Sequence, residues 1–150
     1  MENTKKKIKL LRDYFTKQPD VCLAFIFGSR VKGGATAESD FDIAVYFQPK
    51  LRELEWEGTD YYANEDKIWL ETEKIAGARV DFIVLNRAPA TVAFAVIHEG
   101  EPLVIKDRSL YLRVFLAISS AAEYFRDFTR DFWAIKQRSA SLNEIDRERL

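Results

Sequence analysis

Two aspartates separated by one residue, Asp40 and Asp42, are the strongest chemical signal in the sequence. If they open a β-strand, both side chains project from the same face, because strand residues i and i+2 point the same way. Adjacent carboxylates repel each other unless a cation neutralises them. Carboxylate oxygens are also typical ligands of Mg²⁺, which they hold against substrate phosphates. The pair therefore predicts a divalent metal site.

A Gly-Ser turn, Gly28-Ser29, follows an apolar run and precedes the aspartates by a loop rich in small residues. Its backbone N–H groups and its hydroxyl are suitable donors to a phosphate. Glycine could be only a turn residue here, and serine only a helix N-cap. Both roles are compatible with phosphate binding, since the N-terminus of a helix is itself an anion site. Together, the turn and the aspartates indicate a nucleotide-handling metal site.

A third carboxylate, Asp81, lies near the start of a later apolar run. A buried charge in such a run requires a partner or a metal. A salt bridge to Arg79 or Arg87, or exposure at the strand end, would also explain it. If its strand pairs beside that of Asp42, three carboxylates meet, enough for two metals about 3.5–4 Å apart that clamp the attacking and leaving oxygens in phosphoryl transfer.

The elements that must position these residues follow from apolar periodicity. Gly77 and Gly100 stand where helices end, and Asp107 is a suitable N-cap. The pattern predicts helices over 4–17, 60–76, 88–99 and 107–137, and strands over 21–27, 41–47, 79–85 and 102–105. Residues 138–150 are highly charged and are expected to fray. These elements indicate one α/β or α+β domain, 1–150, with a core over about 4–105 and a long C-terminal helix.

Composition narrows the possible classes of function. The chain has 150 residues, which fits one domain, and a formal net charge of −1, so no overall basic field attracts nucleic acid. Cys22 is the single cysteine, which excludes an internal disulfide and indicates a buried, inert thiol. No signal peptide or membrane span is evident, so we expect a cytoplasmic protein without membrane contact.

Aromatic residues continue toward the C-terminus of the last predicted helix. Phe128, Phe132 and Trp133 have little chain left to cover them. Exposed large apolar side chains often mark a protein interface, so we expect a partner there.

The apolar-Gly-Ser turn, the Asp-x-Asp pair ten residues later and the strand-borne Asp81 resemble the motif of the DNA polymerase β-like nucleotidyltransferase superfamily. The short chain further resembles minimal nucleotidyltransferases (MNT proteins), over residues 4 to about 105. That resemblance implies a small mixed sheet flanked by helices. Such proteins are commonly antitoxins of HEPN-domain ribonuclease toxins, and they transfer AMP from ATP to a toxin tyrosine, which silences the toxin.

The resemblance also implies a role for each matching residue. Gly28 and Ser29 would hold the β- and γ-phosphates of ATP, with Arg30 and Ser39 as further nucleotide contacts. Asp40 and Asp42 would ligate two Mg²⁺ ions. Asp81 would bind the second ion and help to deprotonate the attacking hydroxyl, whose ordinary pKa is near ~10 for tyrosine. A HEPN toxin would be the protein partner, in a hetero-oligomer.

Two other functions remain open from the sequence. Small-molecule nucleotidyltransferases, such as those that modify aminoglycosides, share the motif but usually carry an additional C-terminal substrate domain. An antitoxin that only binds its toxin would keep the fold without catalysis. Template-directed polymerisation is disfavoured, because no basic groove or nucleic-acid domain is evident.

Overall fold

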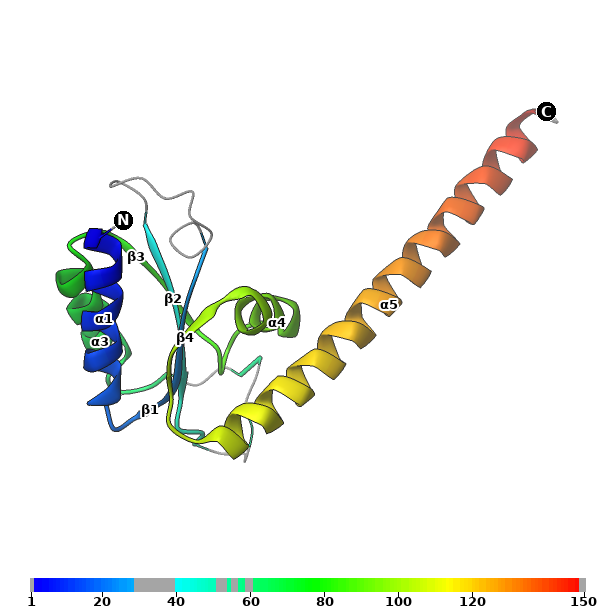
Figure 1. Ribbon diagram of the computed structural model, residues 1–150. Coiled ribbons are helices and arrows are strands. Elements are labelled where there is room, and N and C mark those ends of the chain that lie inside the picture. The colour runs from blue at the N-terminus through cyan, green and yellow to red at the C-terminus, as the bar shows by residue number, and fades with distance from the viewer. Residues whose placement is uncertain (1, 29–39, 51–53, 55–56, 59–60, 149–150) are drawn as a thin grey trace.

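One mixed sheet organises the computed structural model, which describes residues 2–28, 40–50, 54, 57–58 and 61–148 (Figure 1). Within these residues four strands lie in the order β3-β2-β1-β4. The central strand β1 (Val21–Phe27) pairs antiparallel with both β2 (Phe41–Phe47) and β4 (Glu101–Ile105). The edge strand β3 (Val80–Val84) pairs parallel with β2. The predicted small mixed sheet flanked by helices is confirmed.

Helices cover both faces of this sheet. Figure 1 shows α1 (Glu2–Thr16) and α3 (Glu65–Ala76) on one face, and α4 (Ala90–Glu99) with the start of α5 on the other. Helix α5 (Arg108–Glu148) begins against the sheet and then extends far from the body of the molecule. The long C-terminal helix is therefore confirmed, and only its first half can contribute to the core.

The strands alternate their side chains between two hydrophobic clusters, as a sheet covered on both faces requires. The cluster under α1 and α3 contains Leu11, Phe15, Ile26, Phe41, Ile43, Val45, Phe47, Ile68, Val80 and Val84. The cluster under α4 and α5 contains Leu23, Phe25, Ala44, Tyr46, Leu85, Ala93, Val96, Ile97, Leu110, Val114 and Ile118. In β2, the residues on either side of Asp42 belong to the α1/α3 face, which leaves Asp42 on the α4/α5 face.

Some helix boundaries differ from those predicted. Tyr61 and Tyr62 precede α3 instead of forming its first turn, because their rings pack on Arg87 and Phe47. Pro89 occupies the N-cap of α4, whose first helical residue is Ala90. The expected fraying of 138–150 is wrong as far as Glu148, where α5 ends. Charge alone does not stop a helix, and this segment has neither proline nor glycine.

Other local predictions are confirmed. Gly77 adopts the left-handed conformation after α3, and its N–H donates to the carbonyl of Glu73. The carboxylate of Asp107 accepts a hydrogen bond of 3.0 Å from the N–H of Leu110, as an N-cap does. Cys22 is buried, with its thiol 3.1 Å from Oε1 of Gln48. His98 is exposed near the end of α4 and stacks on Phe94.

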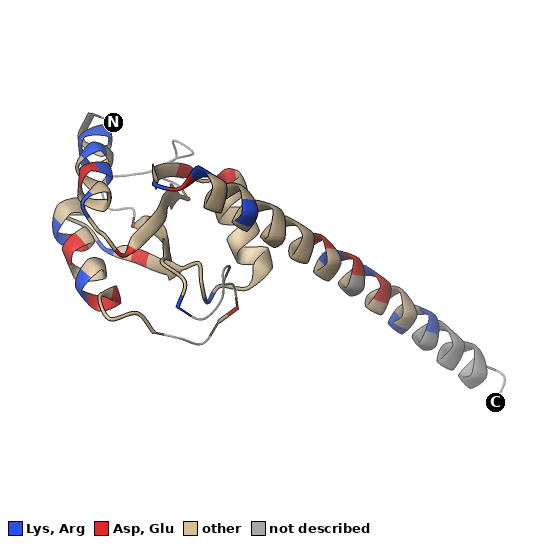
Figure 2. Ribbon diagram, turned by 90° about the horizontal axis from the view of Figure 1, so that it is seen from below, with Lys and Arg blue, Asp and Glu red and all other residues tan. Residues whose placement is uncertain are grey.

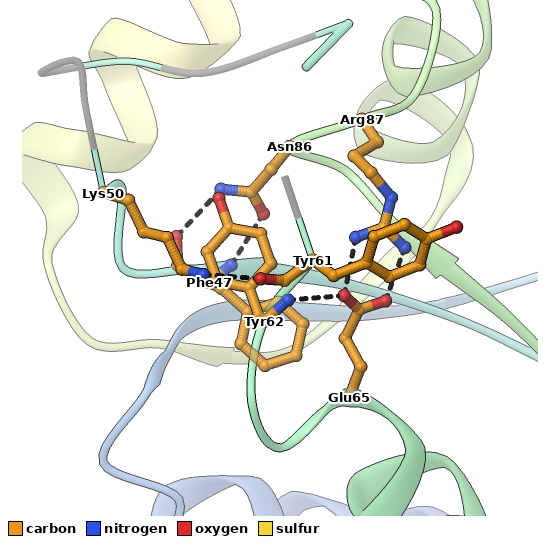
Figure 3. A network of polar contacts seen from close by, with 7 residues as sticks. All are labelled: Phe47, Lys50, Tyr61, Tyr62, Glu65, Asn86 and Arg87. Carbon is orange, nitrogen blue, oxygen red and sulfur yellow. Dashed lines mark hydrogen bonds and ion pairs between the residues drawn. The ribbon is translucent and has the colours of Figure 1, made fainter. Parts of the chain in front are cut away.

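A buried asparagine joins the ends of β2 and the β3–α4 loop (Figure 3). The Oδ1 of Asn86 accepts a hydrogen bond of 2.9 Å from the N–H of Phe47, and its Nδ2 donates one of 3.0 Å to the carbonyl of Phe47. Next to it, the N–H of Leu85 donates to the carbonyl of Val45 at 2.8 Å. The side chain thus continues the β2–β3 ladder past the last residue of β3 and fixes its register.

An ion pair lies beside this asparagine. Arg87 donates two hydrogen bonds to the carboxylate of Glu65, one of them 2.6 Å long, and the N–H of Tyr62 donates a third of 2.8 Å (Figure 3). Burial of Glu65 alone would raise its pKa, but these hydrogen bonds outweigh burial and hold the pKa below its ordinary value. The pair attaches the start of α3 to the loop that follows β3.

Replacing Asn86 with leucine tests whether its hydrogen bonds to Phe47 stabilise the register of β2 and β3. The Asn86→Leu variant leaves the buried N–H and C=O of Phe47 without these partners, which costs about 1–3 kcal/mol for each group. We expect the free energy of unfolding to fall by roughly 2–5 kcal/mol in urea denaturation. Asn3→Leu is the control, since Asn3 is exposed on α1, and its effect should stay within about 0.5 kcal/mol. Equal loss in both variants would contradict this role.

Candidate active site

The parallel register of β2 and β3 places two of the predicted carboxylates side by side. Asp42 is the register partner of Asp81 on β3 and of Phe27 on β1. Because partners in adjacent strands project to the same face, both aspartates lie on the α4/α5 side of the sheet. The condition that the sequence left open, that the strands carrying Asp42 and Asp81 are neighbours, is therefore met.

Asp42 carries the electrostatic strain of the site. Partial burial raises its pKa, and the charge of Asp81, a hydrogen bond between the two carboxyl groups and the charge of Asp40 raise it further. Asp40 lies immediately before β2 and is half-buried, whereas Asp81 is exposed. The site therefore gathers negative charge around one partly buried carboxyl group.

Gly28 lies directly under this carboxyl group. It follows β1 with a φ of +81°, a conformation that favours glycine. A Cβ atom added there would stand 2.1 Å from Oδ2 of Asp42 and 3.0 Å from its Cγ. The glycine is thus required both by its backbone conformation and by the space that the carboxylate occupies.

The donor set fits a hard divalent cation shared with phosphates. Among the described residues, no three histidine, cysteine, aspartate or glutamate side chains converge into a metal-binding group. Mg²⁺ is usually held by one or two carboxylates, with waters and substrate phosphates completing its coordination. The contacting pair of Asp42 and Asp81 meets this need, and a cation would relieve the repulsion that raises the pKa of Asp42.

A pocket of about 350 Å³ adjoins Gly28. It is lined by Phe27 and Gly28 and by the side of α4 that carries Thr91, Val92, Ala95, Val96 and Glu99. Sequence reasoning did not assign these helix residues to the site. Their i, i+3/i+4 spacing shows only that they share one side of a helix. At Gly100, just after this helix, a Cβ would lie 2.4 Å from the carbonyl of Val96 and 3.2 Å from that of Ile26. That close contact sets the end of α4 against the end of β1.

Three predicted nucleotide contacts, Ser29, Arg30 and Ser39, lie outside the described residues. Arg87, one of the two arginines considered as a partner of Asp81, donates hydrogen bonds to Glu65.

Comparison with known proteins decides the family. Residues 9–109 match the family described as polymerase β, nucleotidyltransferase, which covers the described carboxylates and Gly28. The chain belongs to this nucleotidyltransferase family.

Solved structures of the same fold extend over almost the whole chain. A toxin–antitoxin crystal structure with AMP-PNP matches with a TM-score of 0.64 and 22% identity, covering 90% of this chain and 98% of that one. A structure of a tri-AMPylated Shewanella oneidensis HEPN toxin in complex with MNT antitoxin matches with a TM-score of 0.60 and 20% identity, covering 91% and 97%. At this identity the likeness establishes the fold. No curated protein sequence matches the chain.

In the described part of this nucleotidyltransferase, no helix has both the length and the apolar character that a membrane span needs.

The Gly28→Ala variant tests the contact between the turn and Asp42. The added methyl group displaces the carboxylate and strains the backbone, so we expect a loss of about 1–3 kcal/mol in unfolding free energy and loss of nucleotidyl transfer. Gly77→Ala is the matched control, because Gly77 also has positive φ (+60°) but its Cβ would meet only Lys7 Nζ at 3.7 Å. That control should lose stability and keep activity. Retained activity in Gly28→Ala would contradict the assignment.

The Asp42→Asn variant tests the carboxylate repulsion. Since the pKa of Asp42 is raised in the folded state, its ionised form destabilises the fold above that pKa. In EDTA at pH 7 we expect Asp42→Asn to melt a few degrees above the wild type. The difference should shrink as pH falls and the wild-type carboxyl group takes up its proton.

Thermal melts between pH 4 and pH 7 measure this effect. Asp66→Asn, at an exposed position on α3, is the control with the same chemical change. A lower melting temperature for Asp42→Asn at pH 7 would show that the carboxylate stabilises the metal-free fold.

Proposed function

We propose that this nucleotidyltransferase is an antitoxin that transfers AMP from ATP to a hydroxyl group of a HEPN-domain toxin and thereby neutralises it. One observation carries the catalytic part of the proposal: the carboxyl groups of Asp42 and Asp81 meet on one sheet face, directly above Gly28. Such a pair is suited to phosphoryl transfer, where catalysis depends on positioning and charge neutralisation.

The residues of the chain divide this chemistry between them. Gly28 and Ser29 bind the β- and γ-phosphates of ATP, and Asp40 and Asp42 would hold Mg²⁺ against the α-phosphate, because a carboxylate binds a phosphate only through a cation. The toxin hydroxyl oxygen forms a bond to the α-phosphorus, and the bond from this phosphorus to the oxygen bridging to the β-phosphate breaks, which releases pyrophosphate. Asp81 is exposed at an edge strand, where a protein acceptor can reach it, and it receives the hydroxyl proton. Two Mg²⁺ ions, when bound, would neutralise the negative charge of the triphosphate.

The choice of a protein acceptor rests on the fold match. The similar solved structures include toxin–antitoxin complexes, one with AMP-PNP and one with a tri-AMPylated HEPN toxin. The match covers 97–98% of the matched chains in those structures. A tyrosine hydroxyl is the acceptor that we propose, in a hetero-oligomer of antitoxin and toxin. We propose that the reaction takes place in the cytoplasm, where ATP and Mg²⁺ are available.

Transfer of label from α-³²P-ATP tests the proposal. The chain is incubated with Mg²⁺ and the product of the adjacent gene, which the proposal predicts to be a HEPN toxin, and that protein should acquire label and lose ribonuclease activity. Asp42→Asn and Asp81→Asn should each reduce labelling by roughly 10²–10³-fold or more, because each removes a carboxylate that would hold Mg²⁺ against the phosphates, and Asp81→Asn also removes the acceptor of the hydroxyl proton. Asp66→Asn should label as the wild type does, and EDTA should abolish labelling.

The alternatives give different results in the same assay. Neutralisation of the toxin without label would support an antitoxin that acts by binding alone. Label on an aminoglycoside such as kanamycin, with none on the toxin, would support a small-molecule nucleotidyltransferase.

A further inference from the structure

A second concave surface lies between α4 and α5, away from the carboxylates. This groove, of about 560 Å³, is lined by Glu57, by the first residues of α4 (Pro89, Ala90 and Thr91) and by one side of α5 (Ala117, Ser120, Ala121, Tyr124 and Phe125). Small side chains form the floor on α5, and two aromatic side chains stand at its end. Tyr124 is 76% exposed and Phe125 is 55% exposed.

The apolar surface continues along α5 beyond the groove. At about 100° per residue, Ala117, Ala121, Tyr124, Phe132 and Ile135 fall within about 80° of arc; we refer to these five residues as the α5 stripe. Phe132 and Ile135 are 44% and 63% exposed. Figure 1 shows that α5 extends away from the body of the molecule over this stretch.

One cluster of charges beside the stripe is paired within α5. Arg130 lies 3.4 Å from Asp127 and 3.7 Å from Asp131, and the ammonium group of Lys136 lies over the Phe132 ring, 5.2 Å from its centroid. Figure 2 shows acidic and basic residues interspersed along this part of the α5 ribbon. Apolar contact is therefore expected to dominate binding here, and a strongly charged ligand such as a nucleic acid is not favoured.

The position of α4 connects the groove to the active site. Thr91, in the first turn of α4, lines both the groove and the pocket beside Gly28, and the pocket continues along the same helix to Glu99. Ten helical residues span about 15 Å, a distance that an extended segment of about five residues covers. A protein seated in the groove can thus present a side chain to the carboxylates on the same face of the sheet.

We propose that the groove and the α5 stripe are the docking surface for the toxin, which inserts an apolar helix between α4 and α5 while its acceptor segment reaches Asp42 and Asp81. This inference rests on the proposed function. The exposed parts of Tyr124, Phe125 and Phe132 amount to roughly 350 Å², at about 200 Å² for a whole aromatic side chain. Stable complexes bury about 800 Å² on each partner, so these side chains form the centre of an interface that the groove walls and the site rim complete.

Calorimetric titration of the HEPN toxin into the antitoxin, without ATP, tests this surface. Tyr124→Arg, at an exposed position, should raise the Kd for the toxin at least about tenfold, as loss of a central aromatic contact does. Phe132→Arg provides a second test further along α5. Leu116→Arg is the control, because Leu116 is 65% exposed on the same helix but lies about 120° from the centre of the stripe. Its Kd should equal that of the wild type, and circular dichroism should show all three variants folded.

Each other outcome overturns the inference in a recognisable way. Wild-type Kd values for Tyr124→Arg and Phe132→Arg, with the wild-type chain still labelling the toxin, would refute the docking surface and leave the proposed function intact. A dimer of this chain that Tyr124→Arg dissociates without changing toxin affinity would assign the surface to a second copy. A wild-type chain that neither binds nor labels the toxin would refute both proposals.

Discussion

The register between β2 and β3 is the constraint on which the site depends. Asn86 holds it at one end by hydrogen bonds to both backbone groups of Phe47, and the Asp42–Asp81 pair is its consequence at the other end. A shift of one residue would turn one aspartate to the opposite face, into the cluster under α1 and α3. Asn86 is buried and uncharged. Its hydrogen bonds therefore keep the register fixed without adding a charge near the like-charged aspartates at the other end of the strands. The Glu65–Arg87 ion pair attaches the start of α3 to the loop after β3, at the same end of the strands as Asn86.

Around Asp42, the fold brings together carboxylates that repel each other. Burial and two neighbouring acids raise the pKa of Asp42, which means that the metal-free fold is destabilised by its own ionised site. Gly28 allows this by leaving room for the carboxylate that any side chain would displace. Such strain is common where a site is organised for a ligand instead of for stability. A divalent cation is the group that would relieve it, in agreement with membership of the polymerase β nucleotidyltransferase family.

Much of this arrangement could be predicted from the sequence, because its signals are local. The apolar runs at 21–27 and 41–47 have the lengths and composition of buried strands, and both are confirmed. To predict that Asp42 and Asp81 share a face, one must also know that their strands are neighbours. The sequence did not establish this, and the structure does. The contribution of α4 to the pocket, the partner of Arg87 and the role of Asn86 depend on contacts between distant segments, which local pattern does not encode. Helix α5 continues past 137 because its charged end contains no residue that breaks a helix. The predicted contacts Ser29, Arg30 and Ser39 remain predictions.

Titration of the Asp42 carboxyl group by ¹³C NMR tests the central claim most directly, that the β2–β3 register couples Asp42 to Asp81. In the metal-free wild type, the pKa of Asp42 should lie above the ordinary aspartate value, and Asp81→Asn should lower it by removing the adjacent charge. Burial remains in that variant, so the pKa should fall without returning fully to the ordinary value. An Asp42 pKa that is ordinary in the wild type, or unchanged by Asp81→Asn, would contradict the account.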